Sequence, residues 1–219
     1  MIALRSLMTA LPYNPAERRR AWAGAFAPYF DMAPKERDPA PGLLALTRHR
    51  FEALTLFEMT APAQTFRRTP VMAAGQALDH LMVLFWLDGE GRVTWHGGTA
   101  AFGRLQGVVL NLAQPATLVV GPVQATGLVL PRALVGDRLP DLAALHGAVL
   151  DLASDPVSRL FFTSVQDLAE NASAVRDDML PQVTRAIATV AAAALCRLTA
   201  VCPTAIVPAP KRLLEEVPA

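Results

Sequence analysis

Charge, cysteine and histidine are all scarce in this chain, and each shortage narrows the class of protein. Charged residues make up 18% of the 219 residues, and the formal net charge at pH 7 is +1. A chain that neutralises many nucleic-acid phosphates by itself is visibly basic, so we expect this chain not to bind DNA or RNA alone. Its two cysteines, Cys196 and Cys202, fit a reducing compartment and lack the repeated pairs of a zinc site. We therefore expect both to be packing residues.

The four histidines give little support for a metal site. A metal centre of the cupin type needs about three neutral imidazoles and a carboxylate around one ion. His49, His80, His96 and His146 never form a His-x-His pair. Nucleophile elbows, Walker loops and dinucleotide-binding glycine motifs are also missing. We expect no metal, no cofactor and no catalytic group.

Long uninterrupted apolar runs are missing too, although 53% of the residues are hydrophobic. A membrane-spanning helix needs roughly 18 consecutive apolar residues. The longest runs are broken by Asn111, Gln114 and Pro115, or by Arg185 and Arg197. The apolar part of the N-terminus is too short for a signal peptide. We expect a cytoplasmic protein with no membrane partner.

The stretch from Asp79 to His96 is the most informative part of the sequence. It reads as a strand, then a turn at residues 88–92, then a second strand from Val93, which predicts a hairpin. Both sets of alternating side chains on the first strand are mainly apolar: His80, Met82, Leu84 and Trp86 in one, and Asp79, Leu81, Val83, Phe85 and Leu87 in the other. This strand is therefore expected to be buried on both faces, in a sheet that encloses a core and is also covered from outside.

The flanking segments predict an N-terminal helix, a series of strands and two C-terminal helices. Asn14-Pro15 is a helix start, and further helices are expected after Asp155-Pro156 and near Met179. Between them, turns every 8–12 residues are typical of a sandwich or barrel. Strands are expected within residues 43–59, 64–69, 99–105, 107–112, 117–120 and 126–130. The expected fold is α+β: a cupin-like antiparallel β-barrel with an N-terminal helix, followed by an antiparallel helical hairpin.

Several segments, in their order, resemble a known family. They are an aromatic N-terminal helix, Asp79-His80-Leu81, Gly91-Arg92, residues 103–110 with Gln114-Pro115, and residues 128–132 before the paired helices. Together they resemble the N-terminal effector-binding and dimerisation region of AraC/XylS-type transcriptional regulators, over roughly residues 20–200. The chain departs from that pattern at residues 105–107, where the family commonly has Pro-Gly-Asp.

The resemblance implies a barrel that receives a small-molecule effector and helices that pair two subunits into a homodimer. It also implies DNA binding through two helix-turn-helix units, which this chain lacks, so we expect a truncated regulator or a stand-alone sensor. The expected division is an arm and helix at 1–42, a barrel sensor at 43–132, a helical dimerisation region at 133–202, and at 203–219 a linker towards the absent DNA-binding domain.

Candidate site residues follow from the aromatic, methionine and arginine side chains of the strands. The expected contacts of a small, largely apolar effector are Arg50, Phe57, Arg67, His80, Met82, Trp86 and Trp95. The same apolar stripe also suits a plain core, and the sequence does not decide which strand face points inward. For the dimer, helical spacing selects Val183, Ile187, Val190, Ala194 and Leu198, for which packing against the barrel wall is the alternative.

Two other functions remain open on the sequence alone. One is a small cupin-type enzyme or isomerase, and the other is a ligand-free interaction module. The leading hypothesis is a regulatory sensor in which the ligand closes the barrel and changes how the helices present the DNA-binding domain.

Overall fold

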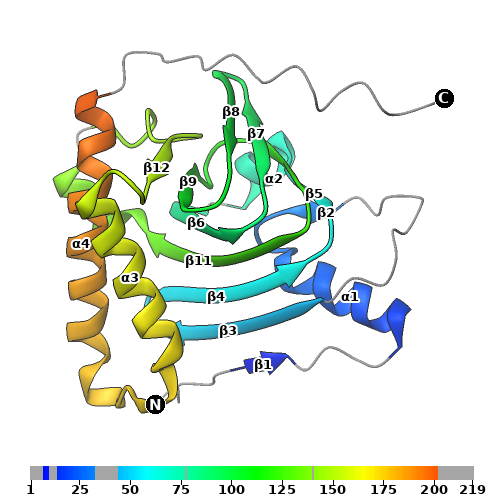
Figure 1. Cartoon of the computed structure of the whole chain (residues 1–219), viewed down its shortest axis with the longest axis horizontal. Helices are drawn as coiled ribbons and strands as arrows, with labels where there is room; N and C mark the ends of the chain where they lie inside the picture. The colour runs from blue at the N-terminus through cyan, green and yellow to red at the C-terminus, as the bar shows by residue number, and fades with distance from the viewer. Residues whose placement is uncertain (1–6, 10–13, 33–43, 77, 140, 202–219) are drawn as a thin grey trace.

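The computed structural model describes residues 7–9, 14–32, 44–76, 78–139 and 141–201, which form two antiparallel sheets and four α-helices (Figure 1). The first sheet has the order β1-β3-β4-β11-β6-β9-β12. Its strands, in that order, are Leu7–Thr9, Ala45–Phe51, Leu54–Ala61, Val123–Pro131, His80–Asp88, Gln106–Asn111 and Val149–Asp151. The second sheet has the order β2-β5-β10-β7-β8. Its strands are Asp31–Met32, Gln64–Arg68, Ala116–Val120, Gly91–Trp95 and Gly98–Phe102.

The predicted α+β class and the order of its parts are confirmed, but the sheet does not close into a barrel. The two sheets pack as a sandwich, and among the described residues no strand of one sheet pairs with a strand of the other. The helices are α1 (Pro15–Phe26), α2 (Pro70–Gly75), α3 (Pro156–Glu170) and α4 (Leu180–Val201). Short 3₁₀ turns lie at Arg132–Leu134, Gly136–Arg138, Ala172–Ala174 and Asp177–Met179.

The predicted hairpin at residues 79–96 is wrong in its pairing. β6 pairs with β11 and β9, whereas β7 pairs with β10 and β8 in the other sheet. The turn after Asp88, with Gly89 at φ 90°, therefore carries the chain from one sheet to the other. A turn motif indicates that the chain reverses direction. Which strands then pair with each other depends on the other strands available to each sheet, and the turn residues do not specify them.

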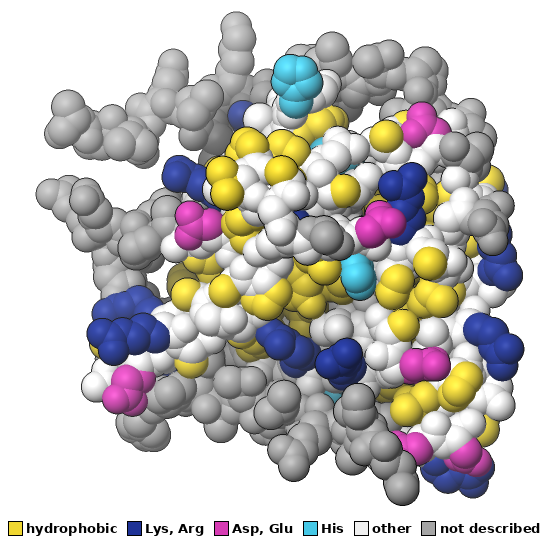
Figure 2. All heavy atoms as spheres, turned by 180° about the vertical axis from the view of Figure 1, so that it is seen from behind, with side chains coloured by type: hydrophobic (Ala, Val, Ile, Leu, Met, Phe, Trp, Pro, Cys, Tyr) yellow, Lys and Arg dark blue, Asp and Glu magenta, His cyan; other side chains and the backbone are white. Residues whose placement is uncertain are grey.

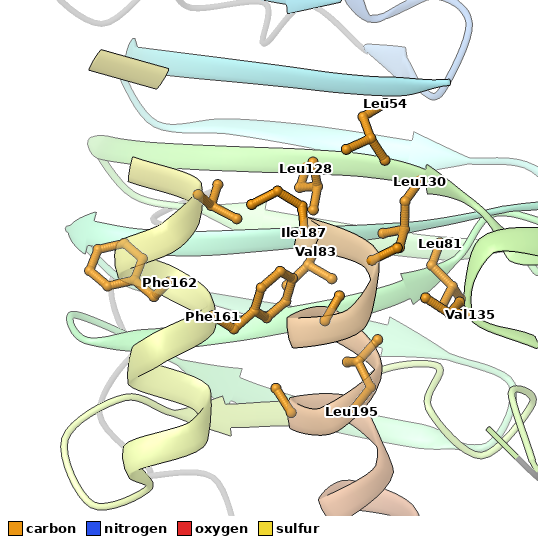
Figure 3. Packing of buried hydrophobic residues seen from close by; sticks show 14 of the residues in the cluster. Leu54, Leu81, Val83, Leu128, Leu130, Val135, Phe161, Phe162, Ile187 and Leu195 are labelled. Atoms are coloured by element: carbon orange, nitrogen blue, oxygen red, sulfur yellow. The ribbon is translucent and has the colours of Figure 1, made fainter. Parts of the chain in front are cut away.

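Burial of β6 on both faces is confirmed. Leu81, Val83 and Phe85 face the helices α3 and α4, in a core shown in Figure 3. Met82, Leu84 and Trp86 belong to the second core, which lies between the two sheets and includes residues of α1. Alternate side chains of one central strand thus build two separate cores, as the period of two requires.

Local sequence signals explain where the helices begin. The Asn14 side chain accepts a hydrogen bond from Ala16 N–H (2.9 Å) ahead of α1, and the Asp155 carboxylate accepts from Ser158 N–H (3.1 Å) ahead of α3. Both helices have proline at the first position, where no intrahelical donor is needed. In Figure 1, α3 and α4 run antiparallel, side by side.

Smaller features of the prediction also have an outcome in the structure. Residues 43–59 form two strands, β3 and β4, and Phe51 at the end of β3 packs with Leu54 and Leu56 of β4 in the core under α3 and α4. The reversal occurs at Glu52, whose φ is 48°. Cys196 is exposed, not a packing residue, because it lies on the outer side of α4. Cys202 and residues 203–219 lie outside the described residues.

One described segment, Asp177–Thr199, is long and apolar enough to cross a membrane by length and composition alone. It includes Arg185 and Arg197, the two arginines that interrupt its apolar sequence. Its buried side chains pack against the first sheet and α3, as those of a core helix do. The length and apolarity of this helix are therefore weak evidence for a membrane span.

Candidate functional site

The candidate site is the apolar core between the two sheets, which we call the inter-sheet cluster. Its buried members come from α1 and from strands of both sheets: Trp22, Phe26, Phe30, Leu46, Phe57, Met59, Ala61, Phe66, Met82, Leu84, Trp86, Val93, Phe102, Val108, Leu110, Leu112, Ala116, Leu118, Val120, Val123, Ala125 and Val129. Strand alternation aims these side chains at one another across the two sheets. This is an apolar interior of the kind that small-molecule sites use.

Four of the seven sequence-predicted ligand residues belong to this region. Phe57, Met82 and Trp86 are buried inside the inter-sheet cluster, and Trp95 packs at its margin. His80 alternates with Met82 on β6, so it points to the same side at the end of the strand. The structure does not bring Arg50 or Arg67 here, because both side chains are exposed.

The arginine that does reach the interior is Arg68, which the sequence interpretation passed over for Arg67. Arg68 is 2% exposed and shares its strand face with Phe66, a member of the inter-sheet cluster. Its Nε donates to Leu112 O, and its Nη1 donates to Tyr29 O (2.9 Å) and to Gln76 Oε1 (3.1 Å). Side chains two positions apart on a strand point to the same face, so the apolar Phe66 was the sequence signal that favoured Arg68 over Arg67.

Buried polar atoms without a partner distinguish this core from a plain apolar one. Among the described residues they include Arg68 Nη2, His80 Nδ1, Trp86 Nε1 and Gln64 Nε2. Gln64 Oε1, in contrast, accepts from Trp22 Nε1 (2.9 Å), which ties α1 to β5. Buried polar groups in folded proteins are nearly always hydrogen-bonded, so such a group needs an explanation.

Burial sets the protonation of the two histidines near this region. Burial lowers the pKa of His80, partly opposed by the negative charge of Asp79. Burial also lowers the pKa of His146, whose Nδ1 accepts from Asn111 N–H (3.0 Å) and whose Nε2–H donates to Pro115 O (3.2 Å). The His146 ring also packs edge-on against Trp95, at 6.1 Å between centroids. Both ring nitrogens of His146 thus have partners, whereas the buried Nδ1 of His80 has none among the described residues.

Within the described part of the chain, no three His, Cys, Asp or Glu side chains gather where they could hold an ion. Viewed from behind, the molecule has a hollow near the middle of the face in which hydrophobic side chains are visible, with basic side chains near its rim (Figure 2). The chemistry available is therefore apolar contact with a few hydrogen-bond donors.

The five residues predicted at a dimer interface have two different environments. Ile187 and Ala194 are buried against the chain's own first sheet and α3. Val183, Val190 and Leu198 are partly buried beside the same core. On α3, Leu160 is the large apolar side chain that remains exposed, at 55%.

Two facing antiparallel sheets with an apolar interior, an N-terminal helix and a C-terminal helix pair define a cupin-like α+β domain. The chain belongs to the AraC-binding-like domain family, whose model matches residues 18–196. No curated protein matches the chain.

Several solved structures are similar to most or part of this chain. The AraC-like transcriptional activator CuxR superposes with a TM-score of 0.74 at 19% identity, covering 88% of this chain and 70% of that one. More distant matches include the Cupin_2 domain of an XRE family transcriptional regulator from Enterobacter cloacae (TM-score 0.33, 16% identity, 40% of this chain and 95% of that one). Another is KdgF from Halomonas sp. (TM-score 0.32, 13% identity, 44% and 84%).

Proposed function

We propose that this chain is the effector-binding domain of a transcriptional regulator and that a small, largely apolar molecule binds in the inter-sheet cluster. The observation that carries the proposal is the set of unpartnered polar atoms, among them Trp86 Nε1, inside an otherwise apolar interior. A ligand that replaces water at these atoms would gain both apolar burial and hydrogen bonds. Family membership supports the same function.

In this proposal, the effect of ligand binding is transmitted from the inter-sheet cluster through the first sheet to helices α3 and α4. β6 and β11 contribute side chains both to the inter-sheet cluster and to the core under α3 and α4. A ligand that repacks one face of these strands can shift the equilibrium between two arrangements of the helices. The size of that shift is set by the difference between the affinities of the ligand for the two arrangements. In this proposal the helices pair two copies, and DNA is contacted by a domain outside this chain, in the cytoplasm.

The test is a thermal-shift screen of the chain against apolar acids, aromatic compounds and lipids. A ligand that binds only the folded state stabilises it by about 2.7 kcal/mol at a hundred times its Kd. Trp86 is fully buried in the cluster, so a ligand there should change its fluorescence. Trp86→Phe should reduce that signal and, because it removes the Nε1 donor, should also reduce the thermal shift.

No stabilisation across a broad panel would favour an interaction module instead. A metal-dependent cupin enzyme has less support, because the described residues do not gather three metal ligands. Metal analysis of the purified protein tests that alternative directly: one equivalent of tightly bound iron, manganese or zinc would favour it.

A further inference from the structure

Arg68 is a buried cation for which the described residues provide no counter-charge. Its three acceptors, Leu112 O, Tyr29 O and Gln76 Oε1, are all neutral. The ion pairs found between described residues do not include it. Burial alone lowers the pKa of Arg68, with no opposing carboxylate. Because a guanidinium stays protonated, the side chain remains charged inside the protein.

The donors of Arg68 are only partly used. A guanidinium has five N–H groups, one on Nε and two on each terminal nitrogen. The Nε and Nη1 donors are satisfied by protein oxygens, so both N–H groups of Nη2 are left without an acceptor. An uncompensated buried charge is strongly unfavourable, and an anion at Nη2 removes that penalty.

The backbone of Leu112 connects Arg68 to a second residue with an unpartnered side-chain atom, His80. Leu112 N–H donates to His80 O (2.9 Å), and Leu112 O accepts from Arg68 Nε. His80 and Arg68 therefore flank the same residue, although they come from different sheets. The Nδ1 atom of His80 is buried and has no partner among the described residues.

We propose that the effector carries one carboxylate, which binds between Arg68 Nη2 and His80 Nδ1, while its apolar body lies against Met82 and Phe57. This inference rests on the proposed function and specifies the class of effector. One fixed positive charge and one neutral imidazole match a single negative charge, whereas a phosphate dianion would leave one charge uncompensated. A neutral imidazole with its proton on Nδ1 donates the second hydrogen bond.

The experiment compares matched acids and amides on the full chain. The probes are octanoate, decanoate and cyclohexanecarboxylate, each with its primary amide, and affinities come from thermal shift and calorimetry. We expect at least one acid to bind, with its amide weaker by about tenfold or more, because hydrogen bonds to a charged partner are the stronger ones. This comparison needs no variant and stands even if an Arg68 variant folds poorly.

Variants then identify the residue. Arg68→Gln should reduce acid binding by about tenfold or more and leave the weak amide binding unchanged. Arg67→Gln, on the exposed side of the same strand, should bind acids like the unchanged chain. The melting temperature without ligand reports whether each variant is folded.

The outcomes separate this inference from the proposed function. If amides bind as well as acids, or if Arg68→Gln and Arg67→Gln lose acid binding equally, the carboxylate assignment is overturned while an effector site remains. If none of the three acids binds, the carboxylate assignment fails, whereas the effector site itself fails only if the broader panel of aromatic compounds and lipids also gives no stabilisation.

Discussion

The ring of Phe57 lies directly over Gly127, its partner across the β4–β11 pair. A Cβ built on Gly127 would stand 2.1 Å from Phe57 Cζ, far inside van der Waals contact. Gly127→Ala therefore forces Phe57 to move within the inter-sheet cluster. Overpacking of this kind destabilises by about 1–3 kcal/mol, which urea unfolding measures.

Gly24→Ala is the matched control for that substitution. Nothing lies within 4 Å of the Cβ it would add, and Gly24 is in the interior of α1. Alanine is the better helix former, so this variant should be more stable by about 0.5–1 kcal/mol. If both variants lose stability equally, the contact with Phe57 is not the cause.

Local patterns were enough to predict much of this fold. The caps at Asn14 and Asp155 depend on two or three neighbouring residues, so the helix starts follow from sequence alone. Burial of β6 on both faces follows from its two apolar sets of side chains. The change of sheet after Asp88 could not be predicted, because it depends on pairing with β10 and β11, which lie far along the chain.

Prediction of the candidate site was limited in the same way, because part of it depends on packing between strands that are far apart in the sequence. The aromatic and methionine residues follow from the clear alternation of β6. Alternation also places Arg68 on the same face as Phe66, but which face of β5 is buried depends on its packing beside β10. A shift by one residue exchanges the exposed and the buried arginine. Adjacent arginines cannot be told apart by residue type, so their neighbours must decide.

Thr126 presents a buried hydroxyl to an apolar core. It is 1% exposed, and its Oγ1 has no partner among the described residues. Thr126→Val keeps the shape and removes the unpaired group, so it should raise the unfolding free energy by about 1 kcal/mol. Thr184→Val is the control: Thr184 Oγ1 donates to Phe51 O at 3.5 Å, and its loss should not stabilise. If both substitutions change the unfolding free energy equally, the unpaired hydroxyl of Thr126 is not a source of instability.

His146 makes the fold sensitive to acid. Burial lowers its pKa below the ordinary value of 6.5, so the folded state favours the neutral ring. As pH falls below about 6.5, the unfolded chain takes up a proton before the folded chain does, and stability decreases towards the lowered folded pKa. Protonation would also set an N–H of the ring against Asn111 N–H.

The measurement is urea unfolding between pH 7.5 and pH 5. His146→Asn should be less stable at pH 7.5, because the hydrogen bonds of His146 are lost, and should show a smaller decrease on acidification. The exposed His96 provides the control, since His96→Asn should keep the pH dependence of the unchanged chain. Burial also lowers the pKa values of His49 and His80, so these two histidines should contribute to the acid sensitivity that remains.

Asp155 begins α3 and also contacts the end of α4. Its carboxylate accepts from Val157 N–H and Ser158 N–H, and it lies 3.2 Å from Arg197 Nε. Asp155→Ala should lower the unfolding free energy by about 1 kcal/mol through loss of the cap, whereas Asp155→Asn should keep most of it. Arg197→Ala removes only a largely exposed ion pair and should change stability by less than the cap does. A larger effect of Arg197→Ala would show that the ion pair, not the cap, matters most.

The exposed leucine on α3 provides a test of helix-mediated pairing. Leu160 lies on the same helical layer as the partly buried Val190 and Leu198, which also belong to the proposed interface. If that layer pairs two copies, Leu160→Glu places an unpaired carboxylate in the interface and should weaken the dimer by about tenfold or more. Sedimentation equilibrium over a range of concentrations measures the change.

Val71→Glu is the matched control for Leu160→Glu, because it makes the same kind of change at an exposed residue of α2. It should leave the dimer unchanged, since α2 is not part of the helical layer formed by α3 and α4. A single-subunit species at high concentration in the unchanged chain would contradict pairing altogether. Dissociation by Val71→Glu alone would instead move the interface to α2, and the helices would then serve only as the outer cover of the first sheet.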